Sequence, residues 1–227
     1  MYWEDFGFLL SKNRYSENSV IAEFYTENHG KMPGIIYGAT SKKIKNYLEI
    51  GNKFQMIYTS KSENKIGYFK VEVDSVLTPL FFDNQKKLLC IISTINLIKI
   101  LTVENQINKK VFLLIENFFK ILNDNSWLNN FIFWELELFK VIGYDLALKN
   151  IVNKEFVDNK LSYFVNSNND KKIVPNFLVE NNLSENNTNN LLAGLKLVND
   201  YLDKSILKPN NIPYPKTRNE FISIIKK

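Results

Sequence analysis

Cysteine and histidine are almost absent from this sequence, with one residue of each among 227. Cys90 alone excludes an internal disulfide, and together with His29 it cannot supply the ligands of a Cys/His zinc site. The sequence also lacks a Walker A pattern and a GxGxxG pattern, so it gives no support to a phosphate-binding loop. We therefore expect this protein to hold no metal and no cofactor.

Long uninterrupted hydrophobic runs are lacking too. The longest apolar stretch, LLCIISTINLIKIL at 88–101, contains Ser93, Asn96 and Lys99 and is too short to span a bilayer. The first residues, MYWEDFGFLL, carry two acids where a secretory signal carries basic residues. We expect a cytoplasmic protein with no membrane partner.

Apolar and aromatic residues are plentiful, at 45% and 14% of the composition. Such a chain buries a core and differs strongly from disordered proteins, and its length favours a small domain followed by a larger one. Lys and Arg number 29 against 24 Asp and Glu, a net charge of +5. This modest excess suggests an anionic partner without requiring one.

The first third of the chain has the pattern of short strands. Its β-rich runs are FGFLL, SVIAEFYT, KMPGIIYG, FQMIYTS and IGYFKVEV, which predict five strands. The longer connector ATSKKIKNYLEIG separates the third run from the fourth. A five-stranded barrel with an insertion after its third strand is typical of an OB-fold, so we predict an OB-fold nucleic-acid-binding domain at residues 1–79.

After Pro79 the hydrophobic period becomes helical, so we predict an α+β protein whose second domain, residues 80–227, is all-helical. We expect Asp83 or Asn84 to cap its first helix, and a capping box at Thr217 to start its last. An asparagine-rich segment at about 150–188 predicts a small irregular insertion. The helical patterns cover residues 88–98, 111–122, 128–142 and 191–207.

Groups that could perform catalysis are few. His29 precedes Gly30 in a predicted turn, where a histidine is usually solvated. Glu135 and Glu137 are two residues apart on a helix and point to different faces, so they form no carboxylate pair. We interpret Glu135 as a structural carboxylate and Cys90 as a core residue, and we expect no enzymatic activity.

Cations and aromatic residues are interleaved in the predicted barrel, as in OB-folds that bind nucleic acid strands. Because aromatic residues of a small barrel are mostly core, we expect two or fewer of these rings to be exposed. A solvated loop is the alternative interpretation of the lysines at 42, 43 and 45. The cations at strand ends and connectors are Lys12, Arg14, Lys31, Lys42, Lys43, Lys45 and Lys53; the rings are Tyr15, Phe24, Tyr25, Tyr37, Tyr47 and Tyr58.

A succession of short motifs runs along nearly the whole chain. The first ones are Asp5-x-Gly7-x-x-Leu10, Arg14-Tyr15-x-Glu17, Thr26-Glu-x-His29-Gly30-Lys31, Gly38-Ala39-x-Ser41-Lys42-Lys43 and Leu48-x-x-Gly51. The later ones are Trp134-Glu135-Leu136-x-Leu138 with Gly143-Tyr144, and Gly194-Leu195-Lys196-Leu197 with Leu207-Lys-Pro209. In order and spacing the chain resembles the bacterial RecO family of recombination mediators.

The resemblance implies an OB-fold joined to a helical domain and a nucleoid-associated, non-enzymatic role in DNA repair and recombination. Such proteins bind single- and double-stranded DNA, anneal complementary strands, recognise the C-terminal tail of single-strand binding protein (SSB), and act with RecR to load RecA at gaps. Many members carry a four-cysteine zinc module, but IVNKEFVDNKLSYF at 151–164 has no cysteine, so we expect no zinc. LSYFVNSNNDKKIVPNFL at 161–178 still resembles the family's strand-turn-strand segment.

We therefore expect DNA binding without sequence preference. Gly30 and Gly38 would permit the tight backbone paths that bring cations to phosphates. A protein-interaction adaptor without annealing activity is one alternative, and an RNA-binding OB protein is another, because single-stranded RNA presents similar phosphates. The residues that we expect to contact DNA are Arg14, Lys31, Lys42, Lys43 and Lys45.

Overall fold

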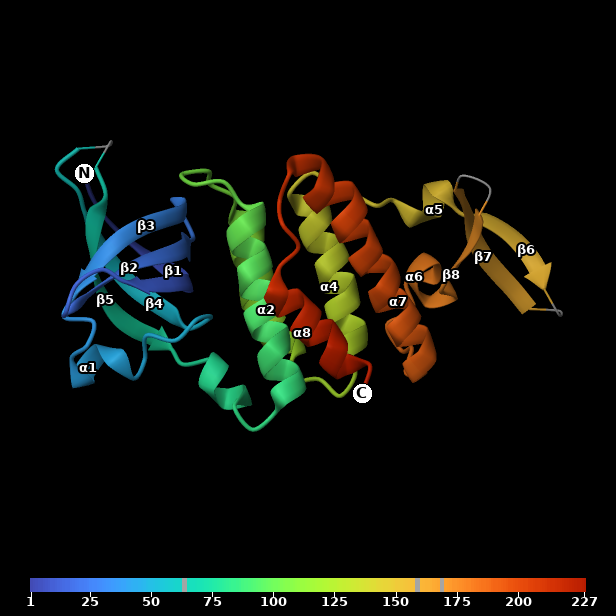
Figure 1. Cartoon of the computed structure of the whole chain (residues 1–227), viewed down its shortest axis with the longest axis horizontal. Helices are drawn as coiled ribbons and strands as arrows, with labels where there is room; N and C mark the ends of the chain where they lie inside the picture. Colours follow the sequence, from blue (N-terminus) through green and yellow to red (C-terminus); the bar gives the residue numbers. More distant parts are fainter. Residues whose placement is uncertain (63–64, 158–159, 168–169) are drawn as a thin grey trace. The chain divides into compact units, whose positions relative to one another are not determined.

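The computed structural model describes residues 1–62, 65–157, 160–167 and 170–227 (Figure 1). The described residues form two compact units, one of Met1–Ile115 with Pro215–Lys227 and the other of Glu116–Tyr214. The C-terminal segment therefore belongs to the same unit as the N-terminal strands. The domain boundary predicted between residues 79 and 80 is a different division of the chain from these two units, and it stays a prediction.

Five strands of the described chain close into a barrel. The order around it is β1-β2-β3-β5-β4, in which β3 and β5 are parallel and the other neighbours are antiparallel. This order, with a helix between β3 and β4, confirms the predicted OB-fold. The bounds are β1 Tyr2–Arg14, β2 Ser19–Thr26, β3 Gly30–Tyr37, α1 Lys42–Lys45, β4 Lys53–Thr59 and β5 Gly67–Ser75.

Aromatic rings fill the barrel, because alternate residues of each strand point inward. The Phe24 ring meets the rings of Phe54 and Phe69 edge to face, at centroid distances of 5.7 and 5.1 Å, a geometry that aromatic quadrupoles favour. Gly34 of β3 makes room for this cluster, since a Cβ there would lie 2.4 Å from the Phe69 ring. The packing of these rings inside the barrel therefore requires a residue without a side chain at position 34.

Helix α2 (Gln85–Leu101) packs against strand β1 of the barrel and follows a 3-10 turn at Thr78–Phe81. The Asn84 side chain accepts a hydrogen bond from the backbone N–H of Lys87 at 3.1 Å, which confirms one of the two predicted caps. Helix α2 thus covers part of the outer surface of the barrel.

The C-terminal helix α8 (Lys216–Ile225) packs on α2. The predicted capping box is wrong, because Pro215 precedes the helix and no side chain caps it in the described structure. Thr217 lies inside the first turn, and its hydroxyl instead accepts a hydrogen bond from Asn96 Nδ2 of α2 at 3.1 Å.

Helix α3 (Lys109–Ile121) leads into the second unit, whose helices α4 (Trp127–Val141) and α7 (Thr188–Tyr201) pack together. No helix in the described part of the chain is long and apolar enough to cross a membrane. Of the four apolar residues that predict the helix at 191–207, Leu195, Val198 and Leu202 are buried and Leu191 is partly buried. The remaining helical elements are α5 Leu148–Ile151, α6 Asn176–Glu180, a π-helical turn at Leu202–Leu207 and a 3-10 turn at Lys208–Asn210.

The segment that we expected to be irregular contains an antiparallel sheet, made within the described residues by β6 (Asn153–Val157), β7 (Lys160–Ser167) and β8 (Asp170–Val174). Adjacent residues Tyr163 and Phe164 of β7 are both buried, so the sequence lacks the period-2 alternation that announces a strand. The pairing of β7 with β8 confirms the two strands of the arrangement implied by the resemblance, while residues 168 and 169 between them lie outside the described residues.

Candidate nucleic-acid interface

One end of the barrel gathers exposed cations. Arg14 ends β1, and helix α1 follows β3. The Ala39 N–H donates to the Asn18 carbonyl oxygen at 3.0 Å, and the Thr40 hydroxyl donates to Asn18 Oδ1 at 2.7 Å. These bonds hold the β1–β2 turn against the α1 connection, so both contribute to the same end. The exposed cations there are Arg14, Lys42, Lys43 and Lys45, and we call this surface the cation end.

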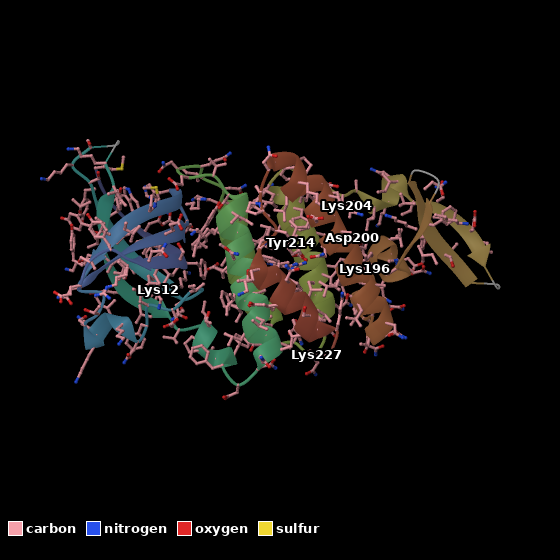
Figure 2. All side chains as sticks on the ribbon, in the orientation of Figure 1. Lys12, Lys196, Asp200, Lys204, Tyr214 and Lys227 are labelled. Atoms are coloured by element: carbon pink, nitrogen blue, oxygen red, sulfur yellow. The ribbon has the colours of Figure 1, made fainter. Side chains whose placement is uncertain are left out.

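Within the described residues, these four cations make no ion pair with a carboxylate. Arg14 Nε lies 3.5 Å from the Ser16 carbonyl oxygen, at the limit of a hydrogen bond. Lys12, which is labelled in Figure 2, is different, because its Nζ lies 3.1 Å from Glu49 Oε1 and also donates to the Leu48 carbonyl oxygen. The cation end is therefore available to an anion, although the exposed Glu17 reduces its net charge.

Tyrosine rings stand beside these cations. Tyr37 at the end of β3 and Tyr68 near the start of β5 are 60% and 45% exposed, and their ring centroids are 6.1 Å apart. They are neighbours because β3 pairs with β5 in parallel, with Ile35 opposite Tyr68. Exposed rings next to unpaired cations are the combination that single-stranded nucleic acid binds.

The expectation of two or fewer exposed rings is wrong. Tyr15 and Tyr47 are exposed as well as Tyr37, whereas the other three predicted rings are buried. The exposed rings occupy a strand end and connections, where side chains leave the barrel interior. Sequence reasoning missed Tyr68, although the alternation in IGYFKVEV, with Phe69 inward, was a signal for it.

Lys31 lies at the far end of β3 from Tyr37 and is 9% exposed. Its Nζ donates to the Lys99 carbonyl oxygen of α2 at 2.8 Å. Burial lowers the Lys31 pKa, although the charges of Glu23 and Glu104 oppose that shift. The structure thus does not bring Lys31 together with the other predicted DNA-contacting residues. DNA contact by Lys31 is expected from the sequence alone, and the structure argues against it, because the ammonium would have to leave the Lys99 carbonyl oxygen.

The two glycines expected to permit tight paths have positive φ angles, +70° at Gly30 and +68° at Gly38. At Gly38 no described atom lies within 4 Å of the position of a Cβ, so the glycine serves the turn toward α1. At Gly30 a Cβ would lie 2.1 Å from the Gln106 carbonyl oxygen. Gly30 therefore also lets the connection between α2 and α3 pack closely on the barrel.

His29 lies in the β2–β3 turn and its side chain is 31% exposed, so the ring is partly solvated, but it is also held by contacts that the sequence did not indicate. Its Nδ1 lies 2.8 Å from Asp5 Oδ2, and its ring stacks on Trp3 at a centroid distance of 3.9 Å. Asp5 is buried and also accepts hydrogen bonds from the backbone N–H groups of Phe6 and Asn28. A buried carboxylate is unfavourable unless hydrogen-bond donors surround it. The donors that Asp5 gathers therefore fix the turn, and with it the histidine.

Two of the remaining candidate side chains are in the core. Cys90 and Glu135 are completely buried, and Glu137 is exposed on the same helix, α4, so the two carboxylates do point to different sides. In the part of the chain that the structure describes, no group of three or more His, Cys, Asp or Glu side chains could hold a metal ion.

Two family models match the chain. The model described as Recombination protein O N terminal matches residues 1–75, which are the barrel, and the model described as Recombination protein O C terminal matches residues 84–211.

Curated proteins with similar sequences are named DNA repair protein RecO. The chain is 32% identical to the protein of Rickettsia peacockii (strain Rustic) over 145 residues, 64% of this chain and 61% of that protein. It is 27% identical to the protein of Roseobacter denitrificans over 150 residues, 66% of this chain and 62% of that protein. These matches span about three-fifths of either relative. The protein of a Wolbachia from Drosophila simulans is 23% identical over 99% of this chain and 100% of its own length.

Proposed function

The chain belongs to the RecO family of DNA repair and recombination proteins, and from this premise we propose that it binds single- and double-stranded DNA without sequence preference and anneals complementary strands. The observation that supports the proposal is the cation end. Four cations that make no ion pair within the described residues lie there, at the end of β3 that carries the exposed ring of Tyr37, next to that of Tyr68. Phosphates attract cations regardless of sequence, and every base has a face that can stack.

Annealing requires no bond chemistry, so the proposed role is not enzymatic. Two DNA strands repel each other through their phosphates, and cations that neutralise some of those charges lower the repulsion. Bases that stack on tyrosine contribute about 1–3 kcal/mol each while their pairing edges stay accessible. Base pairing between the strands then supplies the free energy that drives annealing.

The proposal extends to partners that family membership suggests. These are the C-terminal tail of SSB, RecR, and RecA, which would be loaded at SSB-coated gaps with the help of RecR. A protein with these partners would work at the nucleoid. The peptide tail would be bound outside the cation end, since that tail must be reached while DNA occupies the cations.

The test is an annealing assay with complementary strands coated with the cognate SSB. Fluorescence energy transfer between labels on the two strands reports how fast they anneal. Charge reversal by Lys42→Glu with Lys43→Glu should abolish annealing. The matched control, Lys109→Glu with Lys110→Glu, reverses two exposed charges at the start of α3 and should leave annealing intact.

The outcomes separate the alternatives. A wild-type chain that binds SSB and RecR but never anneals DNA would be a protein-interaction adaptor. A chain from which matched RNA displaces DNA at equal concentration would be a general single-strand binder. Equal annealing by the charge-reversed pair and by wild type would remove the cation end as the site.

A further inference from the structure

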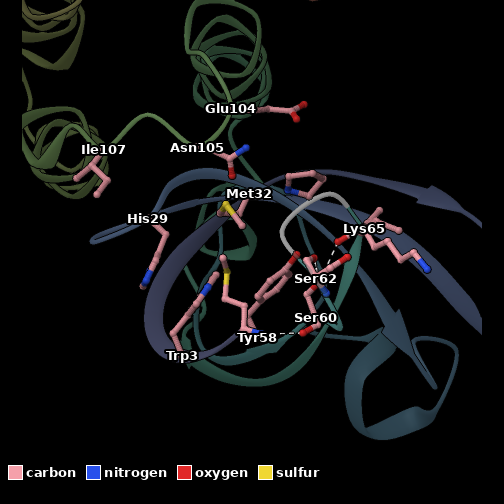
Figure 3. A pocket seen from close by; sticks show the side chains of 13 residues that line it. Trp3, His29, Met32, Tyr58, Ser60, Ser62, Lys65, Glu104, Asn105 and Ile107 are labelled. Carbon is pink, nitrogen blue, oxygen red and sulfur yellow. Dashed lines mark hydrogen bonds between the residues drawn. The ribbon is translucent and has the colours of Figure 1, made fainter.

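Figure 3 shows a cavity lined by Trp3 near the start of β1, whereas Arg14 of the cation end lies where β1 ends. The cavity has a volume of about 530 Å³, within the range of pockets that take small ligands. Its lining comes from the start of β1, the β2–β3 turn, β3 and β4, from described residues of the connection before β5, and from the connection before α3. The residues on which the inference depends are Trp3, Met32, Tyr58, Lys65, Glu104 and Ile107.

One wall of the cavity is fixed to the barrel by backbone bonds. The Asn105 N–H donates to the Lys31 carbonyl oxygen at 3.0 Å, and Lys31 and Glu104 form a β-bridge. Gly30 lets the Gln106 backbone approach closely, as its positive φ and lack of a Cβ allow. The cavity therefore exists before a ligand enters, which lowers the entropic cost of binding.

The floor carries a hydrogen-bond donor without an acceptor. The Trp3 ring lies between His29 and Tyr58, at centroid distances of 3.9 and 4.7 Å. Its two faces are therefore covered, and only the ring edge can contact a ligand. Trp3 Nε1 is buried and has no hydrogen-bond partner among the described residues. A buried N–H group without an acceptor is unfavourable, so a ligand oxygen at this edge would be favoured.

The charges and apolar groups around the cavity select a neutral ligand. Glu104 and Lys65 are labelled lining residues in Figure 3 and carry opposite charges, which offset each other, so this pair gives no net attraction to a charged ligand. Met32 and Ile107 add apolar surface. The walls therefore suit a flat, partly apolar, neutral group with a carbonyl oxygen. The bases thymine, cytosine and guanine are such groups.

The cavity and the exposed tyrosines lie along the same strand. Pro33 lines the cavity, and Tyr37 lies four residues further along β3, on the same side because strand side chains alternate. Four residues of strand span about 13 Å. An extended nucleic acid strand covers that distance with a few nucleotides.

We propose that this cavity receives one unstacked base of a bound single strand, with Trp3 Nε1 donating a hydrogen bond to a base carbonyl. The inference rests on the proposed DNA binding and deepens it by naming a subsite for a base. The base enters at the mouth beside Ile107, and the rest of the strand continues along β3 and β5 toward the cation end.

The test uses the full chain and an oligothymidylate in which single thymines are replaced by 5-iodouracil. After irradiation with near-ultraviolet light, mass spectrometry of peptides locates the crosslinks. Adducts are expected on Trp3, His29 or Met32. Ile107→Trp, which fills the mouth at a side chain that is 59% exposed, should remove them. Val103→Trp, at a 64% exposed position of the same connection outside the cavity lining, should not.

A second variant tests the hydrogen bond itself. Trp3→Phe keeps a ring and removes Nε1, and it should weaken binding of oligothymidylate about fivefold, as loss of one hydrogen bond predicts. Binding of an oligonucleotide built entirely of abasic sites should not change, because it offers phosphates without bases. An equal loss for both probes would mean that the variant disturbs the barrel, and the hydrogen bond would be rejected.

The remaining results separate this inference from the proposed function. If the wild-type chain binds oligothymidylate but crosslinks only outside the cavity, for example at Tyr37 or Tyr68, the base subsite is refuted while DNA binding stands. If Ile107→Trp leaves the cavity adducts in place, the mouth is wrong and so is the subsite. If no oligonucleotide binds, the proposed function fails together with the inference.

Discussion

Neutralising the two adjacent lysines of α1 should weaken binding of single-stranded DNA about 25-fold at about 0.1 M salt. The cation end offers Arg14 and the lysines of α1, which make no ion pair within the described residues. Each phosphate that is neutralised on a single strand adds about −0.7 to the log–log salt slope. Four contacts give a slope of about −3, and two remaining contacts give about −1.4.

The same relation sets the loss of affinity. Lowering the salt from about 1 M to about 0.1 M strengthens each contact by about fivefold, so two lost contacts amount to about 25-fold, or about 2 kcal/mol. The variant Lys42→Gln with Lys43→Gln should still fold, because helix α1, all of whose residues are described, buries none of them.

The measurement is fluorescence anisotropy of a labelled oligothymidylate, repeated across salt from about 0.05 to 0.5 M. The control is Lys109→Gln with Lys110→Gln, which makes the same change in net charge at exposed positions of α3. A flat salt response of the wild-type chain would refute phosphate binding. An equal loss in the control would show that net charge, and not the cation end, sets the affinity.

Three further predictions concern residues that the fold places. Gly34→Ala should lower the free energy of unfolding by about 1–3 kcal/mol, because the new Cβ would lie 2.4 Å from the Phe69 ring; urea unfolding measures this, and an unchanged midpoint would contradict it. Lys31→Met should leave the DNA affinity nearly unchanged, because the Lys31 ammonium already donates to a main-chain oxygen; a loss as large as that of the α1 pair would show that Lys31 contacts DNA. Stability should fall at acid pH as Glu23 gains a proton. Burial alone would raise the Glu23 pKa, but hydrogen bonds from Lys99 and Ser11 and the charge of Lys99 hold it below the ordinary value of 4.5. That stabilisation is complete above the ordinary value and is lost as the pH falls through the lower folded pKa. Thermal unfolding of Glu23→Gln should therefore depend less on acid pH than that of wild type, and identical pH profiles would reject the coupling.

The secondary structure of the barrel could be predicted because its evidence is local. Strand β5 reads GYFKVEVDS, and Phe69 and Val71 are buried while Tyr68 and Lys70 are exposed, as a period of two requires. The same reasoning failed for β6 to β8, since Tyr163 and Phe164 are adjacent and both buried. A strand that is covered on both faces leaves no alternation to detect.

The availability of each cation could not be predicted in the same way. Lys31 and the α1 lysines belong to similar glycine-lysine motifs, and only their neighbours in space separate them. Helix α2, which follows β3 by nearly fifty residues, covers Lys31 and accepts its hydrogen bond. Asp5 likewise holds His29 across 24 positions of sequence.

The sequence by itself determined the barrel, the helical stripes, the family motifs and the placement of cations and glycines at connections, because each depends on residues close together in the chain. Only the tertiary structure decided which cations stay exposed, which tyrosines become neighbours and where a cavity with an unsatisfied Trp3 donor forms. Burial and pairing depend on which distant segments pack together, and no local spacing contains that information.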